Sequence, residues 1–264
     1  MTAPADPALH VEVSGAGPAI ALAHGFAGSA RNFGPQARAL SGATRVVRYD
    51  ARGHARSAAP DDPAAYTPAT FVADLERALA AAGASRAVVG GLSMGAGTAL
   101  RFALVHPERV RALVLAAFPP GAGAASGFAG VAGAFADAIE RDGLEAAGAR
   151  FVWGPSSGLD PGAAKLVRQG FLEHLPHGLA HTLRGVIGRQ PSVAELRPQL
   201  ATLTMPALVI VGGNDRMALE SSRELAAALP AGRLVVIDGA GHVVNLAAPG
   251  AFNAAVQDFL RATE

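Results

Sequence analysis

The stretch AVVGGLSMGAGTALRFALVHP, residues 87–107, joins an apolar run to a helical pattern through one serine set among glycines. Gly91 and Gly95 lie two positions either side of Ser93, in a G-x-S-x-G arrangement. Glycines cost stability unless the backbone must turn too sharply for a side chain. One interpretation is a glycine-rich turn that only packs a strand on a helix. The favoured one is a strained turn that presents the Ser93 hydroxyl at the N-terminus of a helix, where negative charge is stabilised.

Short β-branched runs recur along the chain, and most are followed by a helical segment. They cover residues 9–13, 19–24, 44–50, 86–91, 111–118, 207–213 and 233–238. Gly15 and Gly17 separate the first two runs, a spacing that predicts a hairpin. The last five are nearly continuous apolar runs, typical of strands buried on both faces of a parallel sheet. This alternation predicts an α/β fold with a doubly wound, mostly parallel sheet.

One long segment breaks the alternation of strands and helices. From Pro119 to about Leu200 there is no convincing strand, and the span is too long for an ordinary loop. Stretches within it such as FADAIERDGLEAAGARFV and AKLVRQGFLEHL have helical patterning. We therefore expect a helical cap at residues 119–199, called the cap segment below, inserted between two segments of one core at residues 1–118 and 200–264.

A serine hydroxyl is a poor nucleophile unless a base removes its proton. His242 is the only one of the eight histidines that follows a late predicted strand through a glycine turn. A carboxylate should orient the imidazole, and Asp215 follows the end of another predicted strand. Asp238 competes for that role, although its place at the end of the last strand favours support of the turn. We therefore predict Ser93 as nucleophile, Asp215 as acid and His242 as base.

On these residues the chain resembles the α/β-hydrolase fold superfamily over residues 1–118 and 200–264, with an inserted helical cap. It is most similar to small cap-bearing esterases, 3-oxoadipate enol-lactonases and cofactor-free haloperoxidases. The motif AHGFAG, residues 23–28, resembles the loop that supplies one oxyanion-hole amide in that superfamily. The resemblance implies that the two donors of the oxyanion hole are the backbone N–H groups of Phe26 and Met94.

Other positions of the chain limit how far the resemblance reaches. YDARGHARS, residues 49–57, resembles a loop that is usually structural in the superfamily, so Asp50, Arg52 and His54 receive no catalytic role. Ala96 stands where a third glycine is common. The stretch NLAAPG lacks the glutamate often found after the catalytic histidine. Neither departure touches the predicted triad, but both weaken assignment to any one subfamily.

The resemblance implies acyl transfer on an ester or lactone of a small molecule, with no metal and no organic cofactor. Carbon–carbon bond hydrolysis of a vinylogous diketone is an alternative, because some relatives perform it with the same triad. A ligand-binding receptor or scaffold with incidental hydrolysis is a third class. Epoxide hydrolases and dehalogenases of this fold normally carry an aspartate at the turn, so Ser93 counts against both.

Specificity is expected to lie in the cap segment, where the resemblance fades. Phe128, Phe151 and Trp153 are candidate substrate-binding residues in a pocket wall, together with other apolar side chains of the segment. The alternative for each is that it packs the cap segment onto the core. Few charges can be placed near Ser93, so a mostly apolar substrate is favoured over a polyanion.

Composition argues against several other classes of protein. The net charge is +1, with 22 basic and 21 acidic residues spread along the chain, so neither nucleic acid nor a membrane surface is an expected partner. The absence of cysteine excludes disulfides, thiol catalysis and thiolate metal sites. His174, His177 and His181 are interpreted as core or solvated residues rather than metal ligands. With no signal-peptide pattern and no long apolar stretch, a cytoplasmic protein is expected, and its oligomeric state stays open.

Overall fold

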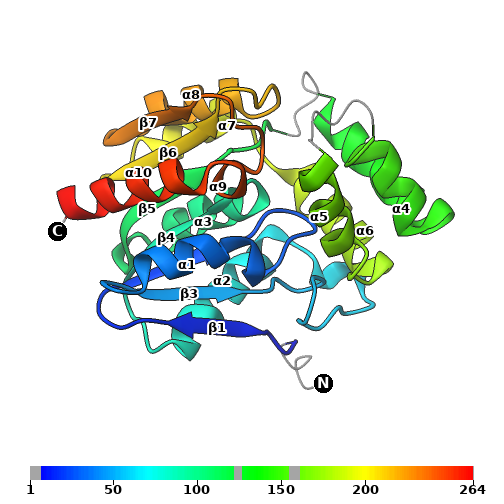
Figure 1. The fold of residues 1–264 in the computed structure, drawn as a ribbon, viewed down its shortest axis with the longest axis horizontal. Coiled ribbons are helices and arrows are strands. Elements are labelled where there is room, and N and C mark those ends of the chain that lie inside the picture. The colour runs from blue at the N-terminus through cyan, green and yellow to red at the C-terminus, as the bar shows by residue number, and fades with distance from the viewer. Residues whose placement is uncertain (1–6, 122–126, 155–160, 264) are drawn as a thin grey trace.

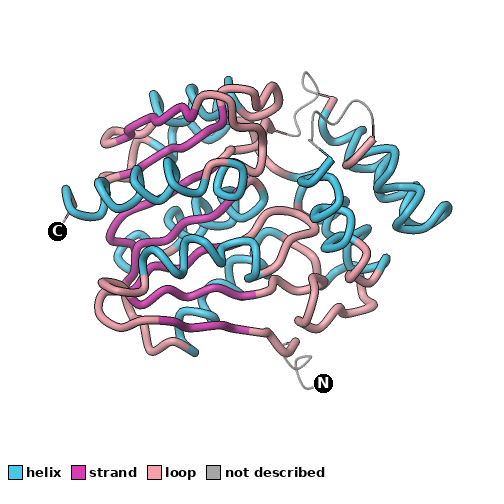
Figure 2. The backbone as a smooth tube through the Cα atoms, viewed as in Figure 1, coloured by secondary structure: helices cyan, strands magenta, loops and turns pink. Residues whose placement is uncertain are grey.

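The computed structural model describes residues 7–121, 127–154 and 161–263, and these form a central sheet with helices on both faces (Figure 1). The strands are β1 (Val11–Ser14), β2 (Ala19–Ala23), β3 (Arg45–Tyr49), β4 (Ala87–Leu92), β5 (Val110–Ala116), β6 (Ala207–Gly212) and β7 (Gly232–Ile237). The helices around the sheet are α1 (Gly34–Leu40), α2 (Pro68–Ala81), α3 (Met94–Val105), α8 (Leu219–Ala228), α9 (Val244–Ala247) and α10 (Pro249–Ala262). Figure 2 separates these elements by type.

The described strands pair in the order β1-β3-β2-β4-β5-β6-β7, and only β1 runs antiparallel to its neighbour. The predicted parallel α/β sheet is therefore confirmed, but the hairpin between the first two strands is wrong, because β3 lies between them. The two glycines of that turn pack instead against the segment leading into β3. A Cβ atom on Gly15 would lie 2.3 Å from the carbonyl oxygen of Thr44, and one on Gly17 would lie 3.1 Å from that of Ala43.

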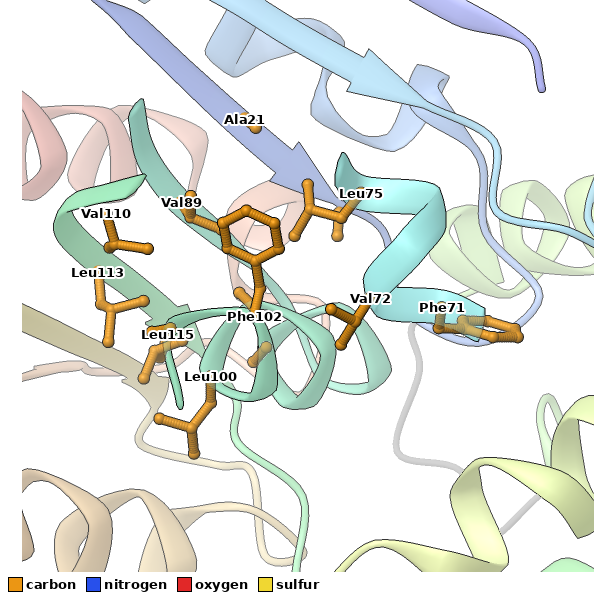
Figure 3. Close-up of a cluster of buried hydrophobic side chains, with 14 of the residues drawn as sticks. Ala21, Phe71, Val72, Leu75, Val89, Leu100, Phe102, Val110, Leu113 and Leu115 are labelled. Carbon is orange, nitrogen blue, oxygen red and sulfur yellow. The ribbon is translucent and has the colours of Figure 1, made fainter. Parts of the chain in front are cut away.

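Apolar side chains fill both faces of the sheet. On one face, α2 and α3 pack against the strands, and Leu75 and Phe102 lie beside Val89, while Leu100 belongs to the same cluster (Figure 3). On the other face, side chains of α1 and α10 form a second cluster with β2, β4, β5 and β6. The strands β2, β4 and β6 are buried throughout, whereas β7 at the sheet edge is partly exposed. The edge explains why β7 is less protected than its apolar sequence suggests.

Between β5 and β6 the described part of the cap segment is helical and contains no strand. Its helices are α4 (Phe128–Phe151), α5 (Pro161–Phe171), α6 (Pro176–Gly185) and α7 (Val193–Leu200), while residues 122–126 and 155–160 lie outside the described chain. Side chains of α4 and α6 share a cluster of their own with Phe171. Val193, Leu196 and Leu200 of α7 join the core cluster instead. The side chains therefore change from the cap cluster to the core cluster at the start of α7, before the predicted boundary at residue 199.

Figure 1 shows α4, α5 and α6 gathered at one end of the strands. Within the described part of the chain, no helix has the length and apolar character that crossing a membrane requires.

A buried ion pair fixes the loop after β3 to α2. Arg52 and Asp74 are 4% and 0% exposed, and the guanidinium donates two hydrogen bonds of 2.7 Å to the carboxylate. Arg52 also donates to the carbonyl oxygens of Ala65 and Thr70. These contacts give Arg52 a structural role, in line with the interpretation of its loop.

Removing one partner of this pair should destabilise the protein strongly, because the remaining charge stays buried without compensation. Asp74→Leu is expected to lower the free energy of unfolding by about 3–5 kcal/mol in urea denaturation at neutral pH. The double variant Arg52→Met/Asp74→Leu should recover a large part of that loss. A double variant as unstable as Asp74→Leu alone would show that the pair matters for shape and not for charge.

Candidate active site

Ser93 joins β4 to α3 in the strained conformation predicted from its glycine neighbours. Its φ of 54° and ψ of −113° lie in a region that side-chain-bearing residues rarely adopt. The glycines are required by close backbone contact. A Cβ atom would lie 2.5 Å from the carbonyl oxygen of Ala23 if built on Gly91, and 2.0 Å from it if built on Gly95. The predicted tight turn is therefore confirmed, and it presses against the end of β2.

Three segments far apart in the sequence meet around the Ser93 hydroxyl. His242, which follows β7, places Nε2 3.0 Å from Ser93 Oγ. Its Nδ1 lies 2.8 Å from Oδ2 of Asp215, which follows β6. A carboxylate only accepts hydrogen bonds, so Nδ1 carries the proton and Nε2 accepts from the serine hydroxyl. The structure thus brings the three predicted triad residues into one hydrogen-bonded chain.

The carboxylate at the far end of this chain is held in its ionised form. Burial by itself raises the pKa of Asp215, which is 4% exposed. Hydrogen bonds from His242 and from the backbone N–H groups of Met217 and Ala218 outweigh burial and hold the pKa below its usual range. Asp238, the competing candidate, lies beside Gly213, and the hydrogen bond to His242 comes from Asp215.

The two predicted oxyanion donors come from the loop after β2 and from the start of α3. Met94 is the first residue of α3, so its N–H has no carbonyl partner within the helix. Phe26 belongs to the loop after β2, and both residues line the same cavity as Ser93. This arrangement is compatible with a pair of N–H groups facing one developing negative charge. Their role as an oxyanion hole stays a prediction.

His24 fixes the loop that carries Phe26, a role that the sequence reasoning missed. Its Nδ1 donates to the carbonyl oxygen of Gly25 at 2.7 Å, and its Nε2 accepts from the N–H of Ala51 at 2.9 Å. Burial lowers the pKa of His24 to about 4, so the ring is neutral at neutral pH and Nε2 is able to accept. The motif AHGFAG contained this signal, since its histidine directly precedes the loop.

A cavity of about 600 Å³ opens over the triad, between the strand ends and the cap segment. Ser93 and His242 line it from the core, and Phe128 and Phe151 line it from α4, where the sequence placed them. The described lining is mostly apolar, but it includes three residues with permanent charges, Arg31, Arg101 and Glu173. The sequence predicted few charges near Ser93, and the structure adds these three charged side chains to the cavity wall.

Trp153 is not among the described residues that line the cavity, so its placement in the pocket wall was wrong. Its ring covers Gly148, where an added Cβ atom would lie 1.8 Å from the indole. The ring also packs edge-on against Phe171, with ring centres 5.3 Å apart. Trp153 thus packs within the cap segment, whereas the alternative interpretation was that such a residue packs this segment onto the core.

Three histidines of the cap segment contact the core through its backbone. The Nε2 atoms of His174, His177 and His181 lie 3.0–3.1 Å from the carbonyl oxygens of Gly28, Ala59 and Asp61 respectively. Such contacts hold α6 and the preceding turn against the core. Among the described side chains, no group of three or more His, Asp or Glu residues is arranged to hold a metal ion.

The sequence matches the model of the alpha/beta hydrolase family over residues 20–255. The chain belongs to this family. It is 31% identical over 250 residues to a Bacillus subtilis (strain 168) protein named for 2-succinyl-6-hydroxy-2,4-cyclohexadiene-1-carboxylate synthase activity, covering 92% of this chain and 90% of the relative.

Two solved structures of the family have closely similar folds. The enol-lactonase from Burkholderia xenovorans LB400 is 27% identical, with a TM-score of 0.83 and 97% of each chain covered. A thermophilic esterase from Thermogutta terrifontis is also 27% identical, with a TM-score of 0.87 over 99% of this chain and 96% of the other. The family and the fold are thereby shown, and the resemblance seen in the sequence is confirmed.

The strain at Ser93 predicts an unusual ranking of variants. Ser93→Gly should be more stable to unfolding than Ser93→Ala by about 1 kcal/mol, because glycine adopts a positive φ without steric cost. In α3, the helix that follows, Ala99→Gly serves as the control and should lower the free energy of unfolding by about 1 kcal/mol. Urea denaturation compares the variants. If alanine were better than glycine at both positions, Ser93 would not be strained.

Proposed function

We propose that this protein is a serine hydrolase that cleaves a carboxylic ester or lactone of a mostly apolar small molecule through an acyl-enzyme. The observation that carries the proposal is the unbroken hydrogen-bonded chain from Asp215 through His242 to Ser93, which ends in the cavity. A buried carboxylate, an imidazole in the right tautomer and a strained serine have no evident structural purpose in this arrangement.

In the proposed first half-reaction, Ser93 Oγ attacks the carbonyl carbon while Nε2 of His242 takes the hydroxyl proton. The ionised Asp215 stabilises the imidazolium that forms. The backbone N–H groups of Phe26 and Met94 stabilise the negative charge on the former carbonyl oxygen. Each such donor typically lowers the activation free energy by about 3 kcal/mol. His242 then gives its proton to the leaving alcohol, and the acyl group stays on Ser93.

In the proposed second half-reaction, His242 takes a proton from water, and the resulting hydroxide attacks the acyl carbon. The same two N–H groups receive the charge again, and His242 returns a proton to Ser93 as the acid departs. The cap segment excludes bulk water from this site and sets which acyl or alcohol group fits. Neither half-reaction draws on any group besides these side chains, backbone amides, substrate and water.

The choice of ester or lactone rests on support outside the triad. Relatives named as an esterase and an enol-lactonase have the same fold, and the cavity is lined mostly by apolar groups. The relative named for a synthase activity shows that members of the family are named for other reactions as well. Bond type is therefore the part of the proposal that an assay must decide.

The role of Asp215 gives the assay a sharp internal comparison. Asp215→Asn should keep the fold and reduce kcat for p-nitrophenyl esters on the order of 10³–10⁴-fold, because an amide favours the wrong imidazole tautomer. Asp238→Asn, the matched control, should change kcat by less than about threefold, since Asp238 does not bond to His242. A large loss of kcat in Asp238→Asn with a mild loss in Asp215→Asn would show that Asp238, and not Asp215, is the acid.

Substrate panels separate the proposal from the two alternatives. Turnover of simple esters or lactones, lost in Ser93→Ala, supports the proposed hydrolase. Turnover confined to a dienone diketone would instead favour carbon–carbon bond hydrolysis. If neither class were cleaved and small ligands only raised the melting temperature, a binding protein would be the better description.

A further inference from the structure

The charges in the cavity wall are not balanced. Among the described lining residues, Arg31 forms an ion pair with Glu173. Arg101 is the remaining permanent charge, and no described carboxylate lies within ion-pair distance of it. The titratable groups of the wall add no anion to face it, because they are the two imidazoles of His174 and His242. The described wall therefore carries one uncompensated positive charge.

The guanidinium of Arg101 has donors to spare. Its Nη2 donates to the carbonyl oxygen of Arg189 at 3.3 Å and to Oε1 of Gln190 at 3.2 Å. A guanidinium carries five N–H donors, and within the described chain Nη1 and Nε have no hydrogen-bond acceptor. Burial lowers the pKa of Arg101, in contrast to Arg184, whose pKa two carboxylates raise. Arginine nevertheless stays charged at neutral pH.

Arg101 lies in register with the nucleophile. Gly97 and Arg101 lie four residues apart on one face of α3, and Ser93 lies four residues before Gly97, at the N-terminal cap of that helix. All three line the cavity. Eight residues of helix correspond to a rise of about 12 Å, and helical side chains lean back toward the N-terminus. The guanidinium is therefore expected on the order of 10 Å from the Ser93 hydroxyl.

The residue between them lets Gln190 pack closely against α3. Gly97 has no side chain, and a Cβ atom there would lie 2.8 Å from Oε1 of Gln190. Gln190 is buried, and it holds the guanidinium from the side of the cap segment. A larger residue at position 97 would displace Gln190 and with it an acceptor that holds the Arg101 guanidinium.

We propose that Arg101 binds a carboxylate on the substrate, at the end of the molecule remote from the bond that Ser93 attacks. This rests on the proposed function and narrows it to a half-ester or lactone acid with an apolar middle. A carboxylate accepts a hydrogen bond from a free N–H group of the guanidinium, and it supplies the counter-charge that the protein lacks. The apolar wall between the two ends accommodates the carbon chain.

A chain-length series tests the proposal kinetically. The substrates are p-nitrophenyl half-esters of adipic, suberic and sebacic acid, each compared with the p-nitrophenyl n-alkanoate of equal chain length. The readout is the ratio of kcat/KM for the anionic ester to that for the neutral one. Arg101→Met removes the charge, and Arg101→Lys keeps it. Arg38→Met is the matched control, because Arg38 is exposed on α1 and outside the cavity wall.

The native protein should prefer the anionic ester at one of these lengths. In Arg101→Met the ratio should fall at least about tenfold, through KM of the anionic ester, as expected for loss of a hydrogen bond between charged groups. Arg101→Lys should retain a preference, and Arg38→Met should match the native ratio. A native preference for neutral esters at every length would overturn the proposal. So would equal ratios in Arg101→Met and native protein, or a shared loss in Arg38→Met.

A binding measurement keeps this test independent of turnover. Monomethyl suberate is titrated by calorimetry into Ser93→Ala and into Ser93→Ala/Arg101→Met. The double variant should bind at least about tenfold more weakly. Equal affinity would refute the role of Arg101 even if esters are cleaved. Weaker binding in the double variant with no cleavage of any ester by the native protein would leave Arg101 as an anion site and remove the proposed function alone.

Discussion

The close approach of β2 to the turn at Ser93 is the constraint on which the active-site arrangement depends. The carbonyl oxygen of Ala23 leaves no room for a Cβ atom at Gly91 or Gly95. With both positions reduced to glycine, the chain passes from β4 into α3 within one residue, and Ser93 takes its strained angles. The same contact brings the loop after β2 beside the serine, so strain at the hydroxyl and access to the Phe26 amide have a single cause.

Electrostatics then divides the site into two ends. At one end, three hydrogen bonds outweigh the effect of burial and keep Asp215 ionised next to His242, so the imidazole can accept a proton from Ser93. At the other end, Arg101 remains without a protein counter-charge in the same cavity. In the proposed mechanism, a negative charge near Ser93 would compete with the oxyanion for the backbone N–H donors, whereas one held at Arg101 would be kept at a distance. The helix α3 sets this separation, because Ser93 caps its N-terminus and Arg101 lies about two turns along it.

The sequence predicted those parts of the site that depend on local chemistry. Glycines at fixed spacing around Ser93, a histidine after the last strand and an aspartate after the strand before it follow from what each side chain needs. Strand pairing was harder, because Gly15 and Gly17 indicate a turn without indicating what the turn packs against. Trp153 was misplaced for a related reason. Size and position in the chain do not say which way a ring points after α4, a helix with non-helical backbone angles at Gly143. Arg101 was not singled out, because only the tertiary structure shows that no described carboxylate forms an ion pair with it.

The central claim is that Ser93 is a nucleophile activated by His242, and covalent labelling tests it most directly. The native protein is treated with a fluorophosphonate, digested, and mapped by tandem mass spectrometry. The account predicts one phosphonyl group per chain on Ser93, none on Ser93→Ala, and strongly slowed labelling of folded His242→Ala. Labelling that persists in Ser93→Ala, or that maps to another residue in the native protein, would contradict it.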